Sequence, residues 1–188
     1  MKKLCTILIA SLSLMCSGFG LVYAQTPVCD EFDGSTINTS MWNLVNDDWT
    51  LSNGQITGHW DIGCAHCDQA NLVLQNAVQP TGDYTFETDM VYEPGKYGHR
   101  VVLYNSAGNK YNIIYDVSQK NFIIEVKQEG ANYVPVIPFI TNLTYNNTSG
   151  AINRAKIVKS GNEYACYLND QYLSTLIDTR WSGDLRRP

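Results

Sequence analysis

The chain has 188 residues, of which 44% are hydrophobic and 16% are charged, and its formal net charge is −5 at pH 7. This length allows one domain with a sizeable buried core. The acidic balance argues against nucleic acid and anionic membrane surfaces as partners, because both bind proteins through basic surfaces.

The first 24 residues have the pattern of a bacterial export signal. Lys2 and Lys3 precede a mostly apolar stretch, and Val22-Tyr23-Ala24 has the form of a cleavage site. Residues 1–24 are therefore predicted to be a signal peptide, and residues 25–188 a single secreted or periplasmic domain. No second apolar run predicts a membrane span. The predicted domain keeps four cysteines, which are Cys29, Cys64, Cys67 and Cys166.

Short runs of β-branched and aromatic residues follow along the rest of the chain, separated by Gly, Asn and Asp. They predict strands within residues 84–92, 99–105, 111–117, 121–128, 155–159, 163–169 and 172–178. In the first of these, one face carries Tyr84, Phe86, Thr88, Met90 and Tyr92, and the other carries Thr85, Glu87, Asp89 and Val91. Residues 134–148, rich in asparagine and containing two prolines, predict a long connection. The pattern indicates an all-β antiparallel sandwich or barrel.

Four stretches resemble the concanavalin A-like, or laminin-G-like, jelly-roll domains of bacterial secreted proteins. They are DEFDGSTINTSMWNLVNDDWTLSNGQITG (30–58), YTFETDMVYEP (84–94), a meander over residues 99–130, and a closing hairpin over residues 153–184. The resemblance implies a jelly-roll β-sandwich. It also implies a last strand after Asp184, and because the sequence ends at Pro188, either a truncated sequence or a sandwich that lacks its final strand is expected. This fold occurs in lectins, binding modules, glycosidases and structural domains, so it says little about function.

The cysteines of the stretch from Gly58 to Leu72 have three interpretations. In an oxidising compartment a disulfide is the usual state, so we predict a bond between Cys64 and Cys67, with Cys29 as the alternative partner of either. A zinc site with two thiolates and two imidazoles, from His59, Cys64, His66 and Cys67, is a second interpretation. A redox pair is the third. Cys166 alternates with apolar neighbours and is expected to face the core.

Aromatic and polar residues indicate a sugar-binding surface, because sugars stack on aromatic rings while polar neighbours bind their hydroxyl groups. Trp60, flanked by His59 and Asp61 beside a glycine-bounded loop, is the best exposed candidate. Arg100 and Tyr104, together with Glu87, are predicted to share the polar face of the sheet. The resemblance places Trp42 and Trp49 near the core hairpins.

Carboxylates offer two further hypotheses. Jelly-roll glucanases carry Glu-x-Asp-x-Glu on one strand, and Glu87 and Asp89 share a face, but Glu93 lies outside that spacing. We favour a polar, solvent-facing strand and predict no catalytic residue. Calcium bound by Asp30, Glu31 and Asp33 is an alternative to a plain acidic surface, which we favour. No other cofactor is predicted.

The sequence thus favours a secreted, non-catalytic, lectin-like module that binds a glycan or another extracellular ligand. A glycoside hydrolase of the same fold, with Glu87 and Asp89 as its acid and base, is the first alternative. A structural or adhesion domain without a small ligand is the second.

Overall fold

The computed structural model describes residues 4–6, 28–45, 48–59, 71–74, 82–94, 99–104 and 108–181. All the regular elements among these residues are strands, which confirms the all-β prediction, and no described helix is long and apolar enough to cross a membrane. The strands are β1 (Leu4–Thr6), β2 (Val28–Asp30), β3 (Trp42–Val45), β4 (Asp48–Ser52), β5 (Gln55–His59), β6 (Asn71–Leu74), β7 (Tyr84–Val91), β8 (His99–Tyr104), β9 (Lys110–Asp116), β10 (Asn121–Lys127), β11 (Val134–Pro135), β12 (Ile152–Ser160), β13 (Glu163–Leu168) and β14 (Gln171–Ile177).

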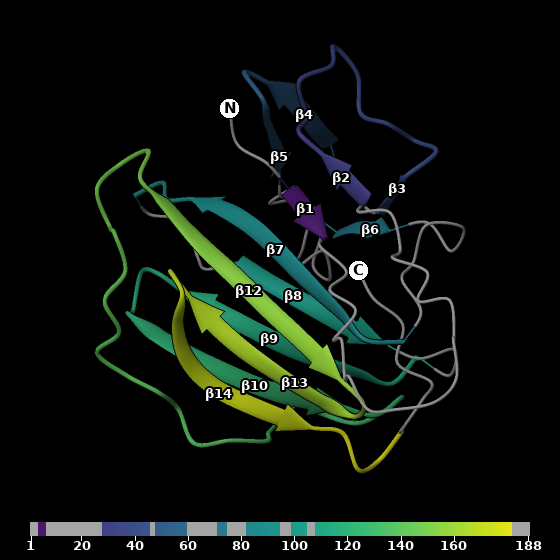
Figure 1. Cartoon of the computed structure of the whole chain (residues 1–188), viewed down its shortest axis with the longest axis vertical. Helices are drawn as coiled ribbons and strands as arrows, with labels where there is room; N and C mark the ends of the chain where they lie inside the picture. Colours follow the sequence, from purple (N-terminus) through teal and green to yellow (C-terminus); the bar gives the residue numbers. More distant parts are fainter. Residues whose placement is uncertain are drawn as a thin grey trace, which may run out of the picture.

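Two four-stranded antiparallel sheets form the body of the protein (Figure 1). The meander sheet has the strand order β11-β10-β9-β8, and the hairpin sheet has the order β14-β13-β12-β7. Buried side chains of both sheets form one hydrophobic cluster between them, which includes Tyr111, Ile113 and Phe122 from the meander sheet and Ile157, Tyr164 and Leu176 from the hairpin sheet. The molecule is therefore an antiparallel β-sandwich, as predicted.

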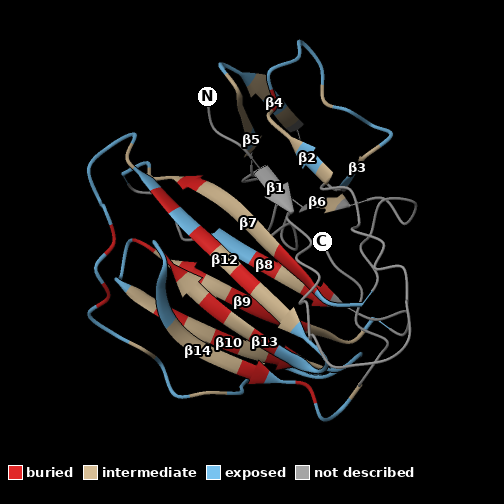
Figure 2. Cartoon of the chain, in the orientation of Figure 1, coloured by how far each residue is buried: buried red, intermediate tan, exposed pale blue. Residues whose placement is uncertain are grey.

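Alternation along each strand separates the core from the outer faces. On β10, Phe122, Ile124 and Val126 are buried, and the residues between them are only partly so, a banding that Figure 2 shows. On β7, Tyr84 and Met90 are buried in the core and Phe86 packs against it, which confirms the predicted face. Cys166 is a free, fully buried cysteine, also as predicted, and burial raises the pKa of its thiol to about 12.

Two tight turns close hairpins at the places that the sequence indicates. Asn53 and Gly54 join β4 to β5, and Asn169 and Asp170 join β13 to β14. All four residues have positive φ angles, between 49° and 69°. Asparagine, aspartate and glycine adopt this left-handed backbone at low cost, and such two-residue turns match the twist of a hairpin.

The segment predicted as a long connection lies along the free edge of β10. Val136 donates to the Ile124 carbonyl at 2.7 Å, and Phe122 and Ile140 exchange backbone hydrogen bonds of 2.9 and 3.1 Å. Farther on, Leu143 and Tyr145 are buried in the core. The segment is thus an irregular edge that shields β10, with Pro135 and Pro138 limiting further pairing.

The N-terminal strands β2 to β5 gather beside one end of the sandwich (Figure 1), around a small cluster formed by Phe32 and Trp42. The burial of Trp42 agrees with its predicted place in a core hairpin. Residues 4–6 belong to the predicted signal peptide and pair with β2. The remainder of residues 1–24, and the end of the chain after Trp181, lie outside the described residues, so the signal peptide and the missing last strand stay predictions.

Asp178, just after β14, fastens the end of the described chain to the meander sheet. Its Oδ1 accepts hydrogen bonds from the Tyr111 hydroxyl at 3.1 Å and from the backbone N–H groups of Arg180 and Trp181 at 3.0 and 2.9 Å. The Trp181 and Tyr111 rings lie 4.9 Å apart. Burial and the Asp178 carboxylate raise the pKa of Tyr111. One buried carboxylate therefore ties the two sheets together.

Candidate ligand-binding face

The outer side of the meander sheet is a mixed polar and apolar surface, which we call the meander face. Register places residues of β10, β9 and β8 directly opposite one another in rows, and opposite residues of antiparallel strands share a face. The first row has Lys127, Lys110 and the backbone position of Tyr104. The second has Glu125, Asn112 and Val102, and the third has Ile123, Ile114 and Arg100.

Tyr133 lies over one end of the meander face, in the loop before β11. The Lys110 and Lys127 ammonium groups are 5.5 and 5.0 Å from the centre of its ring, within the range of cation–π interactions. Partial burial acts to raise the pKa of the Tyr133 phenol. The nearby polar side chains of Lys110 and Asn112 and the charges of Lys110 and Lys127 outweigh it, and the pKa lies below the usual 10.0.

Asn112 lies on the same face but is fully buried. Its amide is near enough to the Tyr133 hydroxyl to contribute to that lowered pKa, yet neither Nδ2 nor Oδ1 reaches the geometry of a hydrogen bond with a described partner. An unsatisfied buried amide costs about 1–3 kcal/mol. Asn153, also fully buried, is different, because its Oδ1 accepts from Asn146 N and its Nδ2 donates to the Asn146 carbonyl, both at 2.8 Å.

The cations of the two sheets differ in their pairing. Among the described residues, the cations that form ion pairs lie on the hairpin sheet, where Arg154, Lys156 and Lys159 pair with Asp89, Asp170 and Asp83 respectively. On the meander face, Arg100, Lys110 and Lys127 have no carboxylate within ion-pair distance among the described residues. The meander face therefore carries positive charge that no described side chain neutralises.

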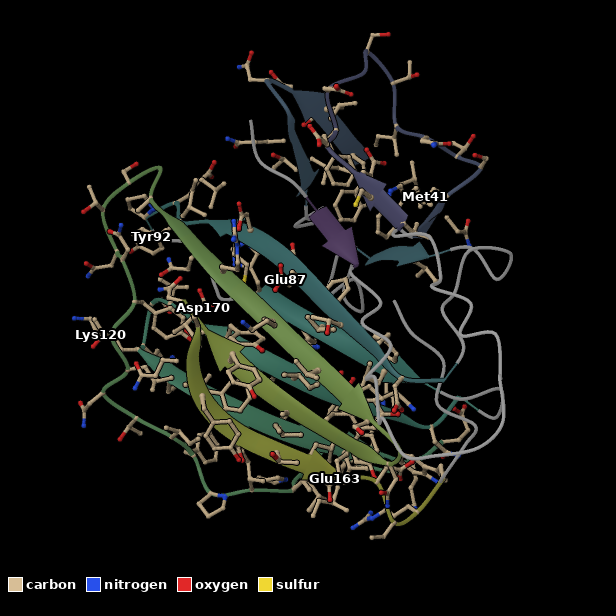
Figure 3. The ribbon with its side chains drawn as sticks, viewed as in Figure 1. Met41, Glu87, Tyr92, Lys120, Glu163 and Asp170 are labelled. Atoms are coloured by element: carbon tan, nitrogen blue, oxygen red, sulfur yellow. The ribbon has the colours of Figure 1, made fainter. Side chains whose placement is uncertain are left out.

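Glu87 and Asp89 lie together on the outer face of the hairpin sheet, as the alternation predicts (Figure 3 labels Glu87). Asp89 accepts two hydrogen bonds from the Arg154 guanidinium, at 2.8 and 3.2 Å, and its side chain is only 8% exposed. The same contact raises the pKa of Arg154. Glu87 lies opposite Lys156, whose ammonium binds Asp170 and lies 5.1 Å from the centre of the Tyr167 ring. These carboxylates are thus part of a row of paired charges.

The prediction that Arg100, Tyr104 and Glu87 share one face is wrong. Arg100 and Tyr104 belong to β8 in the meander sheet, and Glu87 belongs to β7 in the hairpin sheet. The chain passes from one sheet to the other between these strands, so their polar faces point away from each other. Arg100 is exposed on the meander face, and the Tyr104 backbone pairs with Lys110, while the Tyr104 side chain lies outside the described residues.

Most of the loop that carried the sequence-based predictions lies outside the described residues. These include Trp60, Asp61, Cys64, His66 and Cys67, and the His59 side chain, although the His59 backbone ends β5 opposite Asp48. Cys29 takes part in a disulfide bond. Since Cys166 is free, the partner of Cys29 is not among the described side chains. The pairing of Cys64 and Cys67, and the zinc and redox alternatives, stay untested predictions.

Asp30, Glu31 and Asp33, the residues considered as calcium ligands, differ in their exposure and in their hydrogen bonds. The Asp30 carboxylate accepts from Phe32 N and from the Trp42 indole, both at 2.8 Å, so it braces the small N-terminal cluster. Asp33 is exposed and Glu31 is partly so. In the part of the chain that the structure describes, no three His, Cys, Asp or Glu residues are grouped to hold a metal ion. Calcium binding here stays a prediction.

Sequence reasoning missed Lys110, Asn112, Lys127 and Tyr133. Asn112 and Lys127 could have been found, because each alternates with apolar residues on a predicted strand, over 111–117 and 121–128 respectively, and Lys110 lies one residue before the first of these strands. Nothing local marks Tyr133, since its position depends on how the loop folds back over the sheet.

Comparisons with known proteins bear on the fold. No family model matches the sequence, and no curated protein matches it either. Solved structures do match. The carbohydrate-binding module CBM66 from Bacillus subtilis is 18% identical with a TM-score of 0.57, over 78% of this chain and 85% of that one. Laminarinase from Flavobacterium sp. UMI-01 is 10% identical with a TM-score of 0.56, over 84% and 85%. The laminarinase catalytic domain from Thermotoga maritima MSB8 is 10% identical with a TM-score of 0.54, over 84% and 83%.

The chain has a concanavalin A-like jelly-roll fold. The resemblance noted in the sequence is therefore confirmed at the level of the fold. Identities of 10–18% show the fold alone, so the ligand of this jelly roll has to be argued from its own residues.

Proposed function

We propose that this protein is an exported, non-catalytic carbohydrate-binding module whose ligand lies on the meander face. The observation that carries the proposal is Tyr133, whose ring lies near the ammonium groups of Lys110 and Lys127 and beside the buried, unpartnered amide of Asn112. An aromatic ring packs against the apolar face of a sugar, and amide and ammonium groups hydrogen-bond its hydroxyl groups. The meander face provides both kinds of group within one small area.

Two further observations support this function. The solved structures with the same fold include a carbohydrate-binding module and two laminarinases, so the fold accommodates carbohydrate ligands in other proteins. The sequence of residues 1–24 supports export, and exported jelly-roll modules meet polysaccharides outside the cell.

Catalysis is less well supported than binding. A glycosidase needs an acid and a second carboxylate at defined separation. Both carboxylate oxygens of Asp89 accept hydrogen bonds from the Arg154 guanidinium, so this carboxylate is already engaged by a cation. The meander face has two carboxylates in its described rows, Glu125 on β10 and Asp116 on β9, and Asp116 accepts hydrogen bonds from Ser118 Oγ and Gln119 N. Binding without hydrolysis therefore fits the described carboxylates better.

A glycan array followed by affinity electrophoresis tests the proposal. We expect the protein to bind at least one polysaccharide, and Tyr133→Ala to abolish or strongly weaken that binding. Tyr172→Ala is the matched control, because Tyr172 is a 55% exposed tyrosine on the hairpin sheet. Failure to bind any glycan, or equal loss in both variants, contradicts the proposal.

A further inference from the structure

We infer that the ligand of the meander face is an acidic glycan, one that carries carboxylate or sulfate groups. The inference rests on the proposed function and adds the chemical class of the ligand. Three observations support it. They are the pairing of charges on the two outer faces, the opposite positions of Lys110 and Lys127, and the Asn112 amide that has no hydrogen-bond partner among the described residues.

The first observation is the uneven neutralisation of charge. The protein is acidic overall, with a formal net charge of −5, yet Arg100, Lys110 and Lys127 lie on one face without a carboxylate partner among the described residues. Glu125 lies in the rows that these cations occupy and Asp116 lies on the same face farther along β9, so three cations face two carboxylates. The face therefore has a positive excess, and an anionic group on the ligand would neutralise it.

The second observation is that Lys110 and Lys127 lie directly opposite each other on β9 and β10. Like charges at opposite positions of neighbouring strands destabilise a sheet. Both ammonium groups approach the same Tyr133 ring, whose electron-rich face offsets part of that repulsion. An anion bound between the two ammonium groups would offset the remaining repulsion. It would also accept charge-assisted hydrogen bonds from both groups.

The third observation is Asn112, fully buried beside Lys110 and opposite Glu125 with both amide atoms unpartnered. A carboxylate or sulfate alone needs only donors. An amide supplies one donor group and one acceptor, which suits a hydroxyl group of the sugar ring once the side chains that cover Asn112 move aside to admit it. Cations and an amide under one aromatic ring thus match a sugar that carries both hydroxyl and anionic groups.

Isothermal titration calorimetry of the full-length protein with three probes tests this inference. The probes are polygalacturonate, which carries carboxylates, dextran sulfate, which carries sulfates, and neutral dextran. We expect at least one acidic probe to bind and neutral dextran not to bind. Binding should weaken as salt is raised, because screening reduces the attraction between opposite charges.

Variants separate the site from general attraction to polyanions. Lys110→Gln and Lys127→Gln should each weaken binding about tenfold or more, as expected for one lost charge-assisted hydrogen bond. Lys120→Gln removes the same charge from the exposed turn between β9 and β10 (Figure 3) and should leave binding unchanged. Equal loss in all three variants would overturn the inference.

The outcomes also separate this inference from the proposed function. Binding of polygalacturonate alone assigns the carboxylate, and binding of dextran sulfate alone assigns the sulfate. If the glycan array yields only neutral ligands, and the lysine variants bind them as the unmodified protein does, the inference is wrong and the proposed function stands. If no glycan binds at all, the proposed function is wrong and the inference falls with it.

Discussion

Lys110 and Lys127 lie opposite each other on neighbouring strands, with their ammonium groups 5.5 and 5.0 Å from the centre of one tyrosine ring. A protein rarely gains stability from such an arrangement, because the two charges repel. Its presence on an otherwise acidic chain is easiest to understand if the pair binds a negatively charged group.

Replacing either lysine should therefore stabilise the ligand-free protein. We expect Lys110→Gln or Lys127→Gln to raise the free energy of unfolding by about 0.5 kcal/mol, the scale of a cross-strand pair. The double variant should gain little more, since either single change already removes the repulsion. Urea unfolding at low salt measures this, with Lys120→Gln as the control. Destabilisation by both single changes would show that the lysines support the fold instead.

Tyr133 should be distinguishable from the buried tyrosines Tyr111, Tyr115 and Tyr145 by its titration. Its pKa lies below 10.0, whereas burial raises the pKa values of Tyr111, Tyr115 and Tyr145 above 10.0. The first phase of a spectrophotometric tyrosine titration should disappear in Tyr133→Phe and persist in Tyr172→Phe. Because ionisation is easier in the folded state, the protein should gain stability relative to Tyr133→Phe as pH rises through this pKa. An unchanged first phase in Tyr133→Phe would contradict this placement.

The sequence predicts the fold well because the relevant signals are local. The turn residues Asn53 and Gly54 mark a hairpin, and the alternation from Tyr84 to Tyr92 marks a half-buried strand. The sheet that each strand joins could not be predicted in this way, because it depends on contacts between residues far apart in the sequence. Alternation places Glu87 and Arg100 on outer faces, but it cannot tell that those faces lie on opposite sides of the sandwich. Tyr133 could not be predicted for a related reason. It lies in a loop, where no alternation of polar and apolar residues indicates which face of the sheet the side chain will contact.

The carboxylates of β7 should prove dispensable for binding and should support no hydrolysis. We expect Glu87→Gln and Asp89→Asn to bind the glycan found by the array as the unmodified protein does, because both residues lie on the other sheet. Asp89→Asn should cost at most about 1 kcal/mol of stability, since its partner Arg154 is half exposed. Reducing-sugar release that is present in the unmodified protein and lost in Glu87→Gln would establish the hydrolase alternative.

Asn112 and Asn153 offer a matched pair, because both are fully buried asparagines of the sandwich and only one has its hydrogen bonds satisfied. Leucine is similar in size to asparagine and cannot form hydrogen bonds. Asn153→Leu leaves the backbone groups of Asn146 without their partner and should lower the free energy of unfolding by about 1–3 kcal/mol. Asn112→Leu removes an amide that has no described partner, so stability should be unchanged or higher by about 1 kcal/mol.

Binding should respond in the opposite way. Asn112→Leu should weaken glycan binding, because the amide that serves the sugar hydroxyl is lost, while Asn153→Leu should keep its affinity at temperatures where it is folded. Chemical unfolding and calorimetric titration of the two variants, side by side, measure both effects. A stability loss in Asn112→Leu as large as that in Asn153→Leu would mean that the Asn112 amide already has hydrogen-bond partners within the protein. It would then have no free group for a ligand.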